Sequence, residues 1–355
     1  RRTVPRTEGR SPLMESFISS QSSFLVVIVL LLALALVVFS ADKLIDGAVI
    51  VSTELGIPRI VVGATVISLG TTLPELATSI VAVAQGSSDL AVGNATGSVI
   101  TNTTVVLGAG ALFGSIPVLR ETASKLRVFT IVMILLIGLC LLDNGISSFS
   151  IGGLLPQWAG ILLLAVVPVY LFMMFKGSSR LKTPHSSSSD DGAGTDDGRS
   201  KSIRMIAVNL CVIIVFASLL AFGSDAVVSS ASTLAARAGL SEVLIASTII
   251  ALGTSLPELV TTINAARKGR GDLAVGNVLG ANTLNMTLVL GYSATFNQGG
   301  VGIARDIFTT HFPVMVATVA IFSYFVYNTK KHSISRIEGM GLVILYVVYL
   351  TSLII

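Results

Sequence analysis

The chain has 355 residues, of which 52% are hydrophobic and only 12% are charged, and its mean hydropathy is +0.86. This composition is far too apolar for a soluble domain and indicates a polytopic membrane protein. The formal net charge is +4 and the pI is about 9.2, but most basic residues lie in loops between apolar segments, which argues for a topology signal and against nucleic-acid binding.

Ten windows are long and apolar enough to cross a bilayer core of about 30 Å, which takes roughly 20 helical residues. They fall at residues 23–55, 58–84, 89–113, 126–143, 150–175, 203–237, 241–266, 272–294, 307–328 and 338–355. The first and sixth windows are longer than a perpendicular span needs, so these helices should tilt or extend beyond the core. We therefore predict an all-α polytopic membrane protein with ten transmembrane helices.

The distribution of Lys and Arg predicts the orientation. With the N-terminus outside, the inner loops carry 16 of the 23 basic residues, and the outer loops between helices carry only Arg237 and Arg305. The positive-inside rule therefore favours both termini outside, although the N-terminal tail also holds four arginines. We expect an integral protein of the plasma membrane.

A single linker divides the chain, at residues 177–202. It is rich in Ser, Gly and Asp and almost devoid of large apolar residues, so we expect it to be flexible and cytoplasmic. Its DDGAGTDDG stretch fails the EF-hand pattern, because Ala193 and Ser202 stand where that calcium loop needs carboxylates.

The chain contains one long block twice. Residues 70–108 return as residues 253–291 without a gap, at an offset of 183, and 22 of the 39 positions are identical. Each half holds five windows, an odd number, so the second half must enter the membrane from the opposite side. We predict two inverted five-helix repeats. The expected domains are an N-terminal tail (1–22), a first repeat (23–176), the linker (177–202) and a second repeat (203–355).

Both blocks place a proline and a glutamate inside an apolar window. Pro74 and Pro257 lack an amide hydrogen, so their helices should kink or open at residues 70–72 and 253–255. An ionisable group at such depth is by default functional. The freed carbonyls combine with hydroxyls and carboxylates, which are the hard oxygen donors that suit a cation. These side chains are Thr71, Thr72, Glu75, Thr254, Ser255 and Glu258.

The next helix of each half supplies a second polar set. Asn94, Ser98 and Asn102 recur at every fourth position, so they share one helix face. Their counterparts are Asn277, Ala281 and Asn285. Both helices also carry a GxxxG pattern, at Gly93 and Gly97 and at Gly276 and Gly280, which permits close backbone approach. The asparagines could instead only join helices by hydrogen bonds.

Two carboxylates with several neutral oxygens suit a divalent cation with about six to eight oxygen ligands, which describes calcium better than magnesium. The same cage could hold sodium ions or two protons, because a desolvated glutamate is more easily neutralised than left charged and unpaired. A site that is stable with calcium or with sodium ions or protons, but not without any cation, is the basis of an exchanger.

The motifs GTTLPEL and GTSLPEL, each followed by DLAVGN and a later asparagine, resemble the α-repeats of the Ca2+/cation antiporter superfamily and are most similar to prokaryotic Na+/Ca2+ exchangers. The resemblance implies that Glu75 and Glu258 are the central ligands. It further implies that Thr71, Thr72, Thr254 and Ser255 contribute backbone or hydroxyl oxygens, and that Ser98, Asn102 and Asn285 complete calcium and sodium sites. The first helix of each half, near Asp42 and Asp225, would slide as the gate.

We therefore expect a secondary active antiporter that exchanges Ca2+ for Na+ by alternating access. A Ca2+/H+ antiporter and a cation channel are the alternatives. Many family members carry Asp at the position of Asn285 and Ser at that of Ala281, so this site should be less negative. Potassium co-transport is then less expected, and the absence of an acidic residue after Asn94 favours sodium over proton coupling.

The remaining residues offer little other chemistry. The sequence has no nucleophile elbow, P-loop or HExxH pattern and its histidines are isolated, so we expect neither an enzyme nor a cofactor. The expected partners are Ca2+, Na+ or H+ and the lipid bilayer. We expect Asp42 either to be compensated by the adjacent Lys43 or to act as an interfacial anchor. The oligomeric state is not predicted.

Overall fold

The computed structural model describes residues 12–84, 88–118, 120–178, 196–239, 251–328 and 333–354. In the first half the α-helices are α1 (Pro12–Ser20), α2 (Ser23–Leu55), α3 (Arg59–Val62), α4 (Ser68–Thr71), α5 (Leu73–Ala84), α6 (Ser88–Thr101), α7 (Leu107–Phe113), α8 (Arg120–Leu141), α9 (Ser148–Ile151) and α10 (Gln157–Ser178). In the second half they are α11 (Asp196–Arg237), α13 (Ala251–Thr254), α14 (Leu256–Arg267), α15 (Gly271–Leu284), α16 (Leu290–Phe296), α17 (Phe312–Tyr327) and α18 (Arg336–Ile354).

Several membrane helices contain short π-helical segments, and one connection is a 3₁₀ turn. The π segments are η1 (Gly63–Ile67), η2 (Asn102–Val106), η5 (Asn285–Val289) and η6 (Ile307–His311), and the 3₁₀ turn is η3 (Gly145–Ser147). π-Helical turns insert an extra residue into a helix and are frequent at functional sites. They therefore mark places where the regular helical repeat is altered.

Eight helices in the described ranges are long and apolar enough to cross a membrane. They are 23–55, 59–84, 91–113, 121–141, 157–176, 203–237, 271–296 and 307–327. The seventh predicted window lies partly at residues 240–250, outside the described residues, and α18 covers most of the tenth window. The count of ten transmembrane helices stays a prediction.

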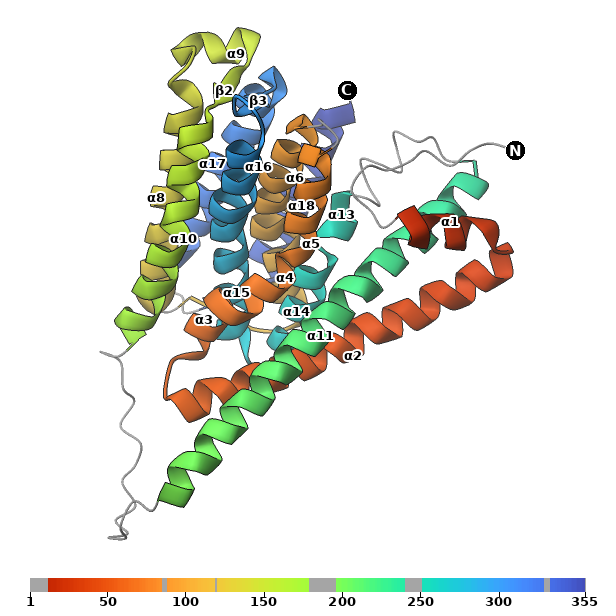
Figure 1. Cartoon of the computed structure of the whole chain (residues 1–355), viewed down its shortest axis with the longest axis vertical. Helices are drawn as coiled ribbons and strands as arrows, with labels where there is room; N and C mark the ends of the chain where they lie inside the picture. The colour runs from red at the N-terminus through yellow and green to blue at the C-terminus, as the bar shows by residue number, and fades with distance from the viewer. Residues whose placement is uncertain are drawn as a thin grey trace.

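The two longest helices form a pair that stands apart from the remaining bundle. Helices α2 and α11 run antiparallel along each other and obliquely across one side of the upright helices (Figure 1). The chain leaves these helices through two glycines in the left-handed conformation, Gly56 and Gly239, which a side chain would disfavour. The two glycines occupy equivalent positions of the repeat, so the repeat extends to the ends of both helices.

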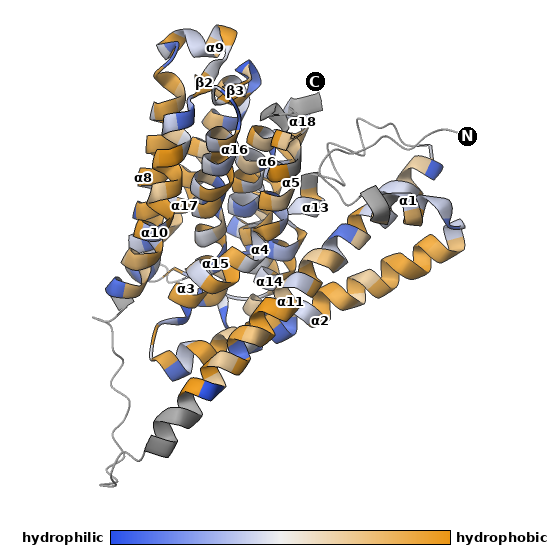
Figure 2. Ribbon diagram, viewed as in Figure 1, coloured by the Kyte–Doolittle hydropathy of each residue, from blue (hydrophilic) through white to orange (hydrophobic). Residues whose placement is uncertain are grey.

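The outside of the bundle suits lipid, and one central helix is enclosed. Figure 2 shows hydrophobic residues along most of α2, α8 and α10, and Leu31, Ile131 and Phe172 on these helices are exposed. By contrast, α15 and the start of η5 are buried at every position from Leu273 to Thr287. The polar residues of α15 therefore face other helices.

Two short antiparallel strand pairs, which the sequence did not predict, join loops of the two halves. Strand β1 (Ile116–Pro117) pairs with β4 (Ser333–Ile334), and β2 (Gly153–Leu155) pairs with β3 (Val301–Ile303). Each pair joins one strand from the first half to one from the second half, so the same kind of link occurs twice.

Helices extend into both ends of the predicted linker. Helix α10 continues to Ser178 and α11 begins at Asp196, so part of the expected linker over 177–202 is helical. No proline interrupts residues 196–237, which lets one helix continue through the polar stretch into the apolar one. Residues 179–195 lie outside the described part. The expected N-terminal tail likewise contains α1.

Candidate cation-binding site

Both Pro-Glu helices are interrupted at the same place, as the prolines predict. Thr72 separates α4 from α5 with φ −83° and ψ −5°, and Ser255 separates α13 from α14 with φ −90° and ψ 11°. These values belong to the sparsely populated bridge region. The interruption is short, because Leu76 N donates to Thr72 O at 3.0 Å and Leu259 N donates to Ser255 O at 3.0 Å.

The second polar set lies at two matching π segments. Segment η2 begins at Asn102 and η5 begins at Asn285, which are again equivalent positions of the repeat. Helix α5, which carries Glu75, packs against η5, and helix α14, which carries Glu258, packs against η2. Each glutamate helix therefore meets the asparagine segment of the other half.

Most of the candidate side chains are buried, and most have no hydrogen-bond partner among the described residues. Glu75, Glu258, Asn102 and Asn285 have no exposed surface. No polar side-chain atom of seven candidates forms a hydrogen bond to the described part of the chain; these are Thr72, Glu75, Ser98, Asn102, Ser255, Glu258 and Asn285. Unpaired polar groups at such depth are costly, so this cluster needs a ligand or protons to satisfy it.

The carboxyl groups of the two glutamates lie near enough to each other for their charges to interact. The Thr71 side chain of the first half also faces the Glu258 carboxyl group of the second, without a hydrogen bond of standard geometry. Two charged carboxylates repel each other in a medium of low dielectric constant, and a cation between them removes this repulsion.

Thr71 is held by a polar chain that crosses the two halves. Its hydroxyl donates to Asn277 Oδ1 at 3.2 Å, and Asn277 Nδ2 donates to Thr261 Oγ1 at 3.2 Å. In the first half, Asn94 Nδ2 donates to Glu75 O at 3.4 Å. Asn277 and Asn94, which share the sequence pattern of the candidate ligands, thus serve as connections between helices.

Thr254 and Ala281 differ from the other residues of the predicted site and its repeat. Thr254 is half-buried, unlike the other predicted hydroxyls. Ala281 is fully buried on α15 and offers no side-chain oxygen, whereas its counterpart Ser98 is buried with a hydroxyl. The site is therefore asymmetric in its neutral oxygens.

Two further hydroxyls near the glutamates were missed by the sequence interpretation. Ser79 and Thr262 each follow a glutamate at the fourth position, have no exposed surface, and have hydroxyls without a partner among the described residues. Their spacing from Glu75 and Glu258, which places them on the same helix face, could have identified them.

The GxxxG pattern of the second half brings two helix backbones into contact. A Cβ atom at Gly280 would lie 2.6 Å from Ala64 O and 2.5 Å from Ser68 Oγ. Helix α15 thus packs directly on η1 and α4, next to the first helix break. The counterpart Gly97 has no such contact, because a Cβ atom there would meet no described atom within 4 Å.

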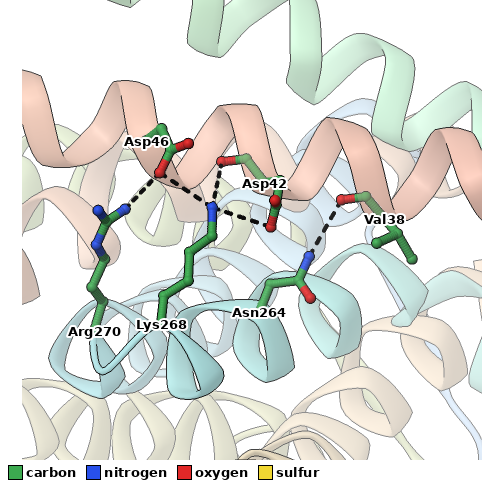
Figure 3. A network of polar contacts seen from close by, with 6 residues as sticks. All are labelled: Val38, Asp42, Asp46, Asn264, Lys268 and Arg270. Atoms are coloured by element: carbon green, nitrogen blue, oxygen red, sulfur yellow. Dashed lines mark hydrogen bonds and ion pairs between the residues drawn. The ribbon is translucent and has the colours of Figure 1, made fainter.

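Asp42 pairs with Lys268 and not with Lys43, so the alternative in which the adjacent lysine compensates it is wrong. Lys268 Nζ lies 3.2 Å from Asp42 Oδ1 and 3.2 Å from Asp46 Oδ1, and Arg270 Nη1 lies 2.7 Å from Asp46 Oδ1 (Figure 3). The adjacent Lys43 instead lies over the Phe39 ring, 5.6 Å from its centroid. Consecutive residues of a helix point in different directions. Asp42 therefore reaches the loop after α14, and Lys43 does not.

The comparisons with known proteins agree with this architecture. The family model described as sodium/calcium exchanger protein matches residues 25–176 and 208–355. The putative antiporter CaxA of Alkalimonas amylolytica is 33% identical, over 91% of this chain and 96% of its own length. The sodium/calcium exchanger MaX1 of Methanosarcina acetivorans is 29% identical, over 92% of this chain and 97% of its own.

The fold is also similar to that of a solved exchanger. A structure of the sodium-calcium exchanger NCX_Mj has a TM-score of 0.74 and 25% sequence identity, and the match covers 94% of this chain and 100% of that chain. The family model alone covers far more than half of the sequence. The chain is therefore an integral membrane protein that belongs to the sodium/calcium exchanger protein family.

Proposed function

We propose that this protein is a secondary active antiporter that exchanges Ca2+ for Na+ by alternating access. The observation that carries the proposal is the pair Glu75 and Glu258, which are fully buried, close enough to interact, and without a hydrogen-bond partner among the described residues. Two such carboxylates are stable only when cations or protons neutralise them. One Ca2+ ion supplies both positive charges.

The proposed ligands are the two carboxylates and the neutral oxygens around them. Calcium accepts about six to eight oxygens from carboxylates, carbonyls and hydroxyls, and sodium ions can use the same types of donor. We assign the ligands to Glu75, Glu258, Thr71, Thr72, Thr254, Ser255, Ser98, Asn102 and Asn285. The site would lie near the bilayer midplane, at the two helix breaks.

The proposed architecture is ten transmembrane helices in two inverted repeats, at residues 23–176 and 203–355. It is supported by features that recur at equivalent positions of the repeat: the breaks at Thr72 and Ser255 and the π segments that begin at Asn102 and Asn285. Both termini would lie outside the plasma membrane and the linker in the cytoplasm, in accord with the positive-inside rule.

Alternating access requires an element that can expose the site first to one side and then to the other. Helices α2 and α11 are suited to this role because they pack mainly on each other and cross the bundle obliquely (Figure 1). A Cβ atom at Gly70 would lie 2.9 Å from Ala217, and Val228 occupies the Cβ space at Gly253. Helix α11 therefore contacts both Pro-Glu helices, and sliding of the pair would reach both ends of the site.

Sodium is proposed as the coupled ion ahead of the proton. Asn102 and Asn285 are buried amides that can coordinate a cation but cannot release a proton at neutral pH. The name of the relative MaX1 describes a sodium/calcium exchanger. A Ca2+/H+ antiporter is the second candidate, because two protons could also neutralise Glu75 and Glu258.

Calcium-45 uptake into proteoliposomes tests the proposal. Vesicles loaded with sodium are compared with vesicles that carry only a proton gradient, acidic inside, for the wild type, Glu258→Gln and the control Glu54→Gln, which changes a glutamate at the end of α2. Sodium-driven uptake that is lost only in Glu258→Gln supports the proposal. Uptake driven only by protons would replace it with Ca2+/H+ exchange, and no uptake under either condition would refute calcium antiport.

The same vesicles separate a carrier from a cation channel. In a carrier, loading the opposite side with Ca2+ accelerates tracer uptake, because a loaded site returns faster than an empty charged one. A channel would conduct without this acceleration.

A further inference from the structure

Ser79 and Thr262 are buried hydroxyls at equivalent positions of the two Pro-Glu helices. A helical Ser or Thr commonly donates to a carbonyl one turn earlier, and Thr261 does so to Pro257 O at 2.7 Å. Ser79 and Thr262 are fully buried, yet neither hydroxyl has a partner among the described residues. A buried hydroxyl without a partner costs free energy, and here the cost occurs twice, at equivalent positions of the repeat.

Both hydroxyls are placed next to the glutamates. Each lies at the fourth position after a glutamate, which puts Ser79 on the face of α5 that carries Glu75 and Thr262 on the face of α14 that carries Glu258. The two helices leave their breaks in opposite directions: α5 rises toward the end of the bundle near β2 and β3, whereas α14 descends toward the other end (Figure 1). The hydroxyls therefore lie on opposite sides of the glutamate pair.

We propose that the Ser79 and Thr262 side chains are further cation ligands, one on each side of the central site, through which Ca2+ passes between the carboxylates and each membrane face. This inference rests on the proposed antiport function. A neutral oxygen one helical turn beyond each carboxylate would replace part of the hydration shell while the ion moves. With the N-terminus outside, Ser79 serves the outer face and Thr262 the inner face.

Right-side-out and inverted membrane vesicles test this pair, because each exposes one face to a varied Ca2+ concentration. Ser79→Ala should raise the KM for Ca2+ at the outer face about tenfold and leave the inner KM unchanged. Thr262→Val should do the reverse. Ser79→Thr and Thr262→Ser keep the hydroxyl and should restore the wild-type KM. Ser148→Ala, which removes a buried hydroxyl on α9, outside both Pro-Glu helices, is the matched control.

The outcomes separate this inference from the function on which it rests. If the wild type exchanges Ca2+ and both variants keep its KM values at both faces, the two hydroxyls are not ligands. Equal KM changes at both faces would likewise contradict a one-sided role. If Ser79→Ala changed only the inner KM and Thr262→Val only the outer KM, both hydroxyls would be ligands and the predicted orientation in the membrane would be reversed. A wild type that moves no Ca2+ would refute the antiport function itself, and this inference with it.

A second inference comes from the ion pairs in Figure 3. Asp42 and Asp46 on α2 bind Lys268 and Arg270, which follow α14, and we call these four residues the ionic latch. Beside it, Asn264 Nδ2 donates to Val38 O at 3.3 Å. Positions 38, 42 and 46 lie on one face of α2, so this face is fastened to the end of α14 over two helical turns.

Three of the four latch residues have no charged counterpart in the other half of the sequence. In the repeat, Lys268 corresponds to Gln85, Arg270 to Ser87 and Asp46 to Ser229, none of which is charged. The equivalent positions of the other half therefore lack the charged side chains that would form the same ion pairs. Ion pairs that join α2 to only one of the two Pro-Glu helices stabilise one position of the α2–α11 pair relative to the other position.

We infer that the ionic latch holds the inner mouth of the site closed and so favours the outward-facing state. The side chains of Asp46 and Arg270 are 45% and 26% exposed, so each pair makes a modest, salt-sensitive contribution. A population shift changes the apparent affinity at the two faces in opposite directions, because ligand binds only the fraction that faces it. This sign distinguishes a latch from a purely structural contact.

The test uses Asp46→Asn and Arg270→Gln, alone and together, in the same two kinds of vesicle. Each variant should lower the KM for Ca2+ at the inner face about two- to fivefold and raise the KM at the outer face. The double variant should add little to either single change. Arg267→Gln, in the same turn but outside the latch, is the matched control. An unchanged or raised inner KM in Asp46→Asn would overturn the inference.

Discussion

The carbonyl oxygen of Ile60 occupies the space that a Cβ atom at Gly276 would need, so the backbones of α3 and α15 touch across the two halves of the chain. Glycine contacts of this kind allow membrane helices to pack without side chains between them. Here they also fix the position of the Pro-Glu helix, because Gly280 on the same face meets Ala64 and Ser68 just before the break at Thr72.

Gly276→Ala should therefore destabilise the protein by about 1–3 kcal/mol, since neither backbone can move without disturbing the site. Thermal unfolding in detergent measures the effect as a lower Tm. Gly138→Ala on α8, where no described atom lies within 4 Å of the added methyl group, is the control and should leave the stability within about 0.5 kcal/mol of wild type. Equal unfolding of the two variants would contradict the close contact.

Glu258→Gln should raise Tm in the absence of divalent ions and abolish the stabilisation that Ca2+ gives. The substitution replaces one of two interacting buried carboxyl groups with an amide that cannot ionise, and it also removes a proposed ligand. A ligand at about 100 times its Kd stabilises the folded state by about 2.7 kcal/mol. Tm measured with and without Ca2+ gives both effects, and a normal Ca2+ shift in the variant would argue against Glu258 as a ligand.

Asn285→Asp and Asn285→Ala form a matched pair that should act in opposite directions. Asn285 is fully buried and its amide has no partner among the described residues. Aspartate adds a third carboxylate, which should lower the Kd for Ca2+ about tenfold or more and destabilise the ion-free protein. Alanine removes the oxygen and should raise Kd. Isothermal titration measures both, and a change of the same sign would place Asn285 outside the ion site.

Much of the fold could be predicted where the signal is local. The bounds of α2 agree with the predicted window because Ser22 accepts from Leu25 N at its start and Gly56 adopts the left-handed conformation at its end. The break at Thr72 follows from Pro74, which comes shortly after it and cannot donate a helical hydrogen bond. The duplicated Pro-Glu motif likewise predicted that Glu75 and Glu258 lie inside the membrane helices.

Other features depend on contacts that a single segment does not contain. Asp42 finds its partner in Lys268, 226 residues away, although Lys43 is adjacent in sequence. The π segment at Asn102 shows no distinct sequence pattern, and helices α14 and α18 of the other half pack against it. The spacing of Ser79 from Glu75 could have identified it, but its complete burial without a partner among the described residues is evident only in the folded chain.

Asn277 should act as a positioning residue for Thr71. It accepts a hydrogen bond from Thr71 at 3.2 Å and donates one to Thr261 at 3.2 Å, so its removal leaves two buried hydroxyls without this link. Asn277→Ala should raise the KM for Ca2+ about tenfold, equivalent to about 1.4 kcal/mol, because Thr71 then loses its fixed orientation toward the site. Calcium-45 exchange in proteoliposomes gives KM, and Tm reports stability separately.

A double-mutant cycle shows whether this effect passes through Thr71. Thr71→Val removes the hydroxyl that Asn277 holds, so the double variant should lose little more affinity than Thr71→Val alone. Additive losses would mean that Asn277 affects the ion by another route. Asn277→Ser, which keeps one polar atom on α15, should recover part of the affinity if orientation of Thr71 is the cause. Recovery of Tm without recovery of KM would instead assign Asn277 to helix packing alone.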